Sequence, residues 1–131
     1  EGLKAGIIDV ITSDHTPQDP ESKVVEFGNA DFGIIGIQTA FPLAVTNLTK
    51  ALGLEGIITK MSINPRTILQ LEVPIIDKGF EANLTLFNPN EKWIFTKENN
   101  QSLSENSPFF DMELNCKVIG AINGKKVFLN E

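Results

Sequence analysis

Residues 7–17 read IIDVITSDHTP and are the stretch from which the fold is inferred. The run Ile7–Ile11 is rich in β-branched residues with one polar interruption, which is typical of a strand buried on both faces of a parallel sheet. From Thr12 to Pro20 the chain consists mostly of turn and loop formers. Polar side chains just beyond the C-terminal end of a buried parallel strand lie where α/β barrels carry their chemistry. The stretch therefore predicts an α/β fold with a functional loop at 12–20.

The middle of the chain predicts helices. Apolar residues recur there at steps of three and four, as on one face of an amphipathic helix: Ile37, Phe41, Ala44, Leu48 and Leu52. With Thr39 as N-cap, Pro42 falls in the first turn, where its missing N–H is harmless, and Gly53 ends the helix. A short helix is expected near 56–61. Asn64 and Pro65 have the pattern of an N-cap and first helical residue for a helix through about Leu71.

The composition becomes β-rich after Pro74. Residues 82–88 alternate between apolar and polar and end in Asn88-Pro89, which predicts a strand and a turn, and 93–96 predicts a second strand. A polar loop follows at 97–107. The last two strands, 116–122 and 126–129, flank Asn123-Gly124, the dipeptide that favours a tight hairpin. We expect two regions, a segment of an α/β barrel at 1–73 and a β-rich accessory domain segment at 74–131.

Composition limits the function classes. The chain has 131 residues, a net charge of −6, one His and one Cys. Its length is too short for a complete (β/α)₈ barrel of ~250 residues. The acidic balance argues against nucleic acid or an anionic membrane as a partner. One Cys allows no internal disulfide, so a reducing, cytoplasmic location is expected. One His excludes a self-contained site of several imidazole ligands. Because the chain begins with Glu1 rather than Met, we expect it to be a piece of a longer protein.

Several motifs follow one another at consistent spacing along nearly the whole chain. They are Ile8–Pro17, Phe32–Ala40, Asn64–Arg66, Gly79–Phe87, Asn106–Phe109 and Gly120–Gly124. In this order they resemble the C-terminal part of type I-like dihydroorotases of the amidohydrolase superfamily. The resemblance implies the last strand of a TIM-like (β/α)₈ barrel with the helices that follow it, and a segment of a small accessory β-sandwich.

The resemblance also assigns chemistry to the loop after the first predicted strand. Dihydroorotases open and close a cyclic amide with zinc, and Asp14 matches the family's metal-ligating carboxylate that also transfers the proton. Metal binding lowers the pKa of water to about 7 and so supplies hydroxide at neutral pH. The family's two zinc ions use further ligands on earlier strands that this chain lacks. We therefore expect no tight zinc binding and no turnover by the 131 residues alone.

Three further residues match substrate-binding positions of the family. Gln18 stands where the family usually has His, and it offers a donor and an acceptor without charge. Phe32 and Gly33 fall in the loop that closes on the substrate through backbone groups. His15 is expected to support Asp14 by hydrogen bonding rather than to bind metal, since metal-ligating carboxylates usually have such partners.

The resemblance leaves the substrate and the partners open. The leading interpretation is a dihydroorotase that interconverts N-carbamoyl-L-aspartate and L-dihydroorotate in de novo pyrimidine synthesis. Gln18 motivates an allantoinase or hydantoinase as an alternative, and a non-catalytic scaffold subunit of aspartate carbamoyltransferase is a third. The rest of the barrel is an expected partner. A homo-oligomer is also expected, because the cut apolar strand at Ile7–Ile11 invites pairing with another copy.

Overall fold

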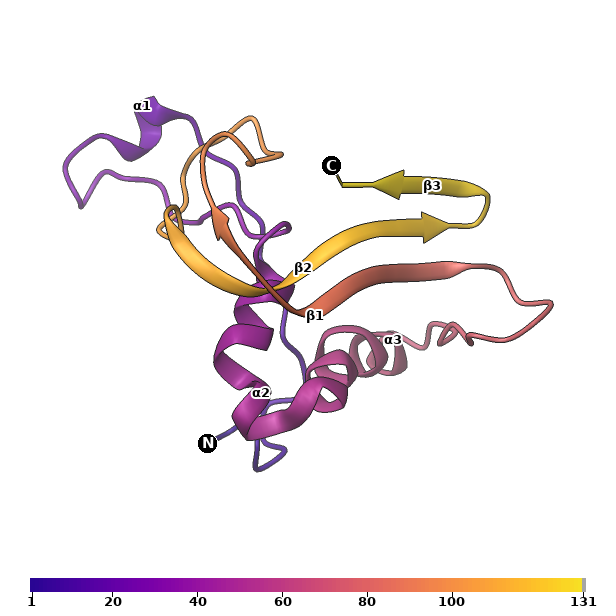
Figure 1. Cartoon of the computed structure of the whole chain (residues 1–131). Helices are drawn as coiled ribbons and strands as arrows, with labels where there is room; N and C mark the ends of the chain where they lie inside the picture. Colours follow the sequence, from indigo (N-terminus) through magenta and orange to yellow (C-terminus); the bar gives the residue numbers. More distant parts are fainter. Residues whose placement is uncertain (131) are drawn as a thin grey trace.

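The computed structural model describes residues 1–130, which form four helical elements and one antiparallel sheet (Figure 1). In chain order the elements are α1 (Pro20–Lys23), α2 (Ala40–Ile58), the π-helical turn η1 (Thr59–Ile63), α3 (Asn64–Ile68), β1 (Asn83–Phe95), β2 (Met112–Asn123) and β3 (Lys126–Leu129). The strand order in the sheet is β1-β2-β3, with antiparallel pairing throughout. Helix α2 packs against β2 near the point where β1 and β2 bend (Figure 1).

The strand predicted at Ile7–Ile11 is not formed, so this prediction was wrong for the chain. A strand satisfies its backbone groups on neighbouring strands, and no strand pairs with this segment within residues 1–130. The helical elements supply partners instead. The backbone N–H of Ile11 donates to the carbonyl of Lys60 at 3.0 Å, and the Asn64 side chain donates to the carbonyl of Asp9 at 2.8 Å.

The helices follow the predicted order with different boundaries. Gly53 interrupts α2 with a φ of 69°, which confirms that the first helix stops there, although a further helical turn follows at once. The separate helix start predicted at Asn64 is wrong, because η1 runs into α3 without a break and Asn64 has helical dihedrals. The side-chain amide of Asn64 donates to the carbonyl of Asp9 and does not cap a helix. Helix α3 ends at Ile68, short of Leu71, and Gln70 then takes a φ of 56°.

The sheet contains one long first strand where two were predicted. The Asn88-Pro89 pair does not end the strand. The ladder instead passes from Asn88 to Lys92 on β1 while only Cys116 intervenes on β2, which is a bulge. The Asn88 side chain accepts a hydrogen bond from the backbone N–H of Asn90 at 3.2 Å. The turn-forming pair Asn88-Pro89 therefore lies at a bulge within one continuous strand.

The C-terminal hairpin and the polar loop before it are confirmed. Asn123 pairs with Lys126, so the two loop residues are Gly124 and Lys125, and Gly124 has a φ of 57°. A positive φ at the first loop residue suits glycine and matches the twist of the flanking strands. Between β1 and β2 the polar residues 97–107 contain no helix or strand.

Two apolar clusters join the helices to the sheet. The first contains residues of α2 and β2 that are almost fully buried: Ala44, Val45, Ile57 and Cys116. The second contains Ile35, Phe95 and Leu114. Both clusters therefore combine residues from 1–73 and 74–131, and the division into two regions stays a prediction. Residues 1–130 contain a single three-stranded sheet, so neither the barrel nor the sandwich is formed within them. None of the helices in this part of the chain is long and apolar enough to cross a membrane.

Candidate functional site

The two segments with the predicted site residues lie side by side. Residues 14–18 follow the first predicted strand, and residues 32–36 lead toward α2. His15 and Ile34 form an isolated parallel β-bridge, and the backbone N–H of Thr16 donates to the carbonyl of Ile34 at 2.8 Å. These two contacts hold residues 14–18 and 32–36 side by side, although a stretch of the loop separates them in sequence.

Two glycines make this close approach possible. Gly33 has a φ of 103°, and a Cβ added there would lie 2.5 Å from the Cβ of Thr16. A Cβ added at Gly36 would lie 2.8 Å from the carbonyl oxygen of Ser13. Glycine permits such close approach because it has no Cβ. In this structure Gly33 and Gly36 allow the backbone to approach Thr16 and Ser13.

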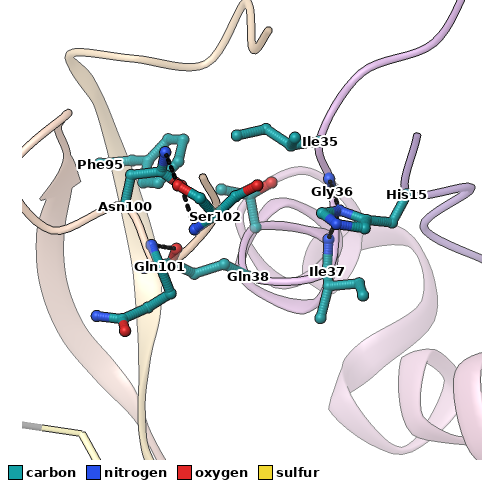
Figure 2. A pocket seen from close by; sticks show the side chains of 10 residues that line it. His15, Ile35, Gly36, Ile37, Gln38, Phe95, Asn100, Gln101 and Ser102 are labelled. Carbon is teal, nitrogen blue, oxygen red and sulfur yellow. Dashed lines mark hydrogen bonds between the residues drawn. The ribbon is translucent and has the colours of Figure 1, made fainter. Parts of the chain in front are cut away.

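The His15 ring is fixed by the backbone that follows Gly33. Its Nδ1 accepts hydrogen bonds from the backbone N–H groups of Gly36 at 3.0 Å and Ile37 at 3.3 Å (Figure 2). Two donors at Nδ1 require that nitrogen to be unprotonated, so the proton of the neutral ring is on Nε2. Nδ1 is therefore occupied by the backbone. The observed partners of His15 are these two amides, and the expected support of Asp14 stays a prediction.

Asp14 has an uncommon backbone conformation at the tip of the first segment. Its φ is 43°, in the left-handed region that Asp tolerates better than most residues, and the residue is exposed. The Thr16 hydroxyl donates to the carbonyl oxygen of Asp14 at 2.9 Å. Such outliers cluster at functional sites. The Asp14 carboxylate is exposed, and it lies two residues before Thr16, whose backbone is bonded to Ile34.

Gln18 and the loop at Phe32-Gly33 are brought together. The Gln18 side-chain amide donates to the carbonyl oxygen of Phe32 at 3.3 Å. The ring of Phe32 is 93% exposed, so this residue meets Gln18 through its backbone. Lys23 also closes the loop, because its Nζ donates to the carbonyls of Asp31 at 2.6 Å and Gly33 at 3.1 Å.

Asn106 is a residue of this site that the sequence-based predictions did not include. Its Nδ2 donates to the carbonyls of Thr16 at 2.9 Å and Gly33 at 3.3 Å, and its Oδ1 accepts from the backbone N–H of Gln18 at 3.3 Å. The residue lies in the polar loop between β1 and β2. The signal available in the sequence was the motif 106–109, which carried the resemblance but suggested no contact.

His15 also lines a hollow of about 190 Å³ (Figure 2). The residues that line it are His15, Ile35, Gly36, Ile37, Gln38, Thr39, Phe95, Asn100, Gln101 and Ser102. Thr39 is 1% exposed, and its hydroxyl has no hydrogen-bond partner within residues 1–130. That hydroxyl does not cap α2, which was the expected role. Neither Asp14 nor Gln18 lines the hollow.

The side chains present do not form a metal centre by themselves. Within residues 1–130 no three His, Cys, Asp or Glu residues gather as a group that could hold a metal ion. Cys116, a possible soft ligand, is fully buried, and burial raises its pKa to about 11. Cys116 thus behaves as a small buried apolar residue. Asp14 can contribute one ligand at most.

Known proteins resemble the chain in sequence and in structure. No protein-family model matches the chain. The chain is 41% identical over 131 residues to a dihydroorotase of Clostridioides difficile, a match that covers 98% of the chain and 31% of that enzyme. It is 43% identical over 116 residues to a dihydroorotase of Elusimicrobium minutum, of which it covers 27%. The chain spans about 30% of the length of such relatives.

Solved structures share the fold of the chain. An L-hydantoinase from Arthrobacter aurescens matches 97% of the chain with a TM-score of 0.85 and 24% identity, and the chain covers 30% of it. An inactive dihydroorotase-like domain of a CAD-like multifunctional protein from Chaetomium thermophilum matches 96% of the chain with a TM-score of 0.64 and 19% identity. The helices and sheet described above are therefore arranged as in a part of these larger proteins.

Proposed function

Because this chain is a dihydroorotase-related segment, we propose that it is the C-terminal part of a dihydroorotase. That enzyme would interconvert N-carbamoyl-L-aspartate and L-dihydroorotate in pyrimidine synthesis. The observation that carries the proposal is 41% identity along 131 residues to an enzyme of that name. The proposal places the enzyme in the cytoplasm.

Asp14 is the proposed catalytic residue. Opening a cyclic amide requires a proton to leave the attacking water and to reach the leaving nitrogen, and a carboxylate within hydrogen-bond reach can do both. The exposed position of Asp14 and its left-handed backbone support this role. Its neighbours hold the segment in place without using the carboxylate, since the Thr16 hydroxyl bonds the Asp14 backbone oxygen.

Gln18, Phe32 and Gly33 are the proposed substrate-binding residues. The hydrogen bond from Gln18 to the Phe32 carbonyl keeps them within reach of one small molecule. Gln18 brings an amide, which can donate to a substrate carbonyl or carboxylate without adding charge. Backbone groups at 32–33 would complete the contacts, and the exposed Phe32 ring would cover the bound substrate.

The zinc dependence of such an enzyme does not fit this chain alone. A binuclear site needs several ligands, and the described residues offer the Asp14 carboxylate without companions. In the proposal Asp14 is one ligand of a zinc centre whose other ligands lie outside these 131 residues. The apolar side chains of Ile7 and Ile37, which are 78% and 69% exposed, would pack against the rest of the barrel.

The test uses the full-length protein with a matched pair of variants. Asp14→Asn removes the proposed proton carrier, whereas Asp19→Asn neutralises a second exposed carboxylate five residues away whose side chain caps no helix. We expect Asp14→Asn to lower kcat on L-dihydroorotate by about 10²–10⁴-fold and Asp19→Asn to leave it within about twofold. Full activity of Asp14→Asn would refute the assignment. The isolated 131-residue chain should show neither turnover nor stoichiometric zinc.

A second candidate keeps the chemistry and changes the substrate. Gln18 lacks the charge that would favour a carboxylated substrate, so an uncharged cyclic amide such as allantoin or a hydantoin is the alternative. Assaying the same full-length protein on dihydroorotate and allantoin separates the two, and a preference for allantoin would overturn the first choice. A non-catalytic scaffold for aspartate carbamoyltransferase is disfavoured by the presence of Asp14. Inactivity on both substrates, with a stable complex with that enzyme, would support it. Light scattering would test the proposed homo-oligomer.

A further inference from the structure

Among residues 1–130, Asn106 is the side chain outside the two site segments that hydrogen-bonds to both of them. It lies in the polar loop between β1 and β2, 88 and 90 residues from its partners Gln18 and Thr16. Its Nδ2 bonds the carbonyls of Thr16 and Gly33, and its Oδ1 accepts from the Gln18 amide. Its own backbone carbonyl accepts from the N–H of Ile35 at 3.1 Å.

The contacts use the particular chemistry of a primary amide. A carboxamide carries two N–H donors and a carbonyl acceptor in one plane, so it can bond two carbonyls and one amide N–H together. An aspartate at 106 would keep the acceptor for Gln18 but would set a carboxylate oxygen against the carbonyls of Thr16 and Gly33. An alanine would leave the Thr16 carbonyl and the Gln18 N–H without these bonds in a half-buried place, and the Gly33 carbonyl would keep only its bond from Lys23.

We propose that Asn106 is a positioning residue for the reaction: it sets the spacing between the Asp14–Gln18 segment and the Phe32–Gly33 segment. This role rests on the proposed function, because it concerns the residues assigned there to substrate binding. Two of the bonds of Asn106 end at Gln18 and Gly33, which are residues assigned there, and the other two end at Thr16 and Ile35, each two residues away. Since Gln18 and Gly33 are assigned to holding substrate, loosening them raises KM more than it lowers kcat.

The same loop contains a matched control. Asn99 also uses both ends of its amide, because its Nδ2 donates to the Ile94 carbonyl at 2.7 Å and its Oδ1 accepts from the Thr96 N–H at 2.9 Å. These partners lie at the end of β1 and touch neither site segment. Asn99→Ala therefore removes a comparable set of side-chain bonds from the same loop without releasing the site.

The experiment compares full-length wild type with Asn106→Ala, Asn106→Asp and Asn99→Ala. Steady-state kinetics on L-dihydroorotate should show KM raised about tenfold by either change at 106, with kcat within about threefold. Asn99→Ala should leave KM within about twofold. Amide hydrogen exchange should show the Gln18 and Ile35 amides exchanging at least about tenfold faster in Asn106→Ala. An unchanged KM in the 106 variants, or an equal rise in Asn99→Ala, would overturn the proposal.

The exchange measurement separates this proposal from the proposed function. If the wild type does not act on any cyclic amide, the proposed function fails and kinetics are lost as a readout. Faster exchange at Gln18 and Ile35 in Asn106→Ala but not in Asn99→Ala then still supports Asn106 as the residue that positions the two segments. Unchanged exchange in Asn106→Ala overturns that role whatever the activity.

Discussion

Replacing Gly33 with alanine is expected to destabilise the paired site segments by about 2–5 kcal/mol. One part of the cost is conformational, since φ is 103° and side-chain-bearing residues pay roughly 1–2 kcal/mol for positive φ. The other part is steric. The new Cβ would lie 2.5 Å from Cβ and 2.7 Å from Cγ2 of Thr16, where carbon atoms prefer about 3.5–4.0 Å. Overpacking of this kind costs about 1–3 kcal/mol.

Two companion variants separate these parts. Gly6 has a φ of 73° with nothing within 4 Å of an added Cβ, so Gly6→Ala should show the conformational cost alone, about 1–2 kcal/mol. Thr16→Gly removes the atoms that the new Cβ would meet. In that background Gly33→Ala should therefore cost about 1–3 kcal/mol less than it does alone.

The free energy of unfolding is measured by urea titration for the wild type, Gly33→Ala, Thr16→Gly, the double variant and Gly6→Ala. Amide exchange at Thr16, whose N–H bonds the Ile34 carbonyl, reports whether the loss is local. The reasoning is refuted if Gly33→Ala costs no more than Gly6→Ala. It is equally refuted if the Thr16→Gly background recovers nothing, because the contact would then carry no energy.

Further predictions concern the core. Ile57→Ala should lower the free energy of unfolding by about 2–5 kcal/mol, because Ile57 is 0% exposed, whereas Ile76→Ala, at 84% exposed, should stay within about 0.5 kcal/mol in urea titration. Trp93→Phe removes the bond from its indole N–H to the Cys116 carbonyl and should cost about 0.5–1.5 kcal/mol by the same assay. The Cys116 thiol should resist Ellman's reagent at pH 8 unless the protein is unfolded, and fast labelling of native protein would contradict its burial. Since burial raises its pKa from 9.0 to about 11, its contribution to stability is complete below pH 9 and declines as the pH rises through about 11.

The elements that the sequence predicts well depend on short-range chemistry. Gly53 interrupts α2 and Gly124 turns the hairpin, because a positive φ is a local property of the residue. Asn88-Pro89 misleads for the same reason. Its turn propensity is real, but pairing with β2 on both sides keeps the strand going and converts the turn into a bulge. The sequence alone does not show whether pairing with β2 will continue the strand through Asn88-Pro89 or let the turn end it.

The predicted strand at Ile7–Ile11 failed because strand formation depends on a neighbour. An apolar, β-branched run shows that a strand is possible, and its backbone then bonds to whatever is near, here Lys60 and Asn64. The same holds for the site. The pairing of His15 with the loop after Gly33 joins residues about 20 positions apart, and the contact of Asn106 with Thr16 joins residues 90 positions apart, so neither contact leaves a local signal.

The contact between Asn106 and Thr16 also determines when, during synthesis, the bonds between Asn106 and the site segments can form. Thr16 and Gln18 leave the ribosome roughly 90 residues before Asn106, an interval of roughly 5 to 20 s at ordinary elongation rates. Until then the two site segments lack the amide that bonds them both. A nascent chain that has completed α2 and β1 therefore still lacks the side-chain bonds of Asn106 to Thr16, Gln18 and Gly33, and a chain that stops before Asn106 would keep Asp14 without them.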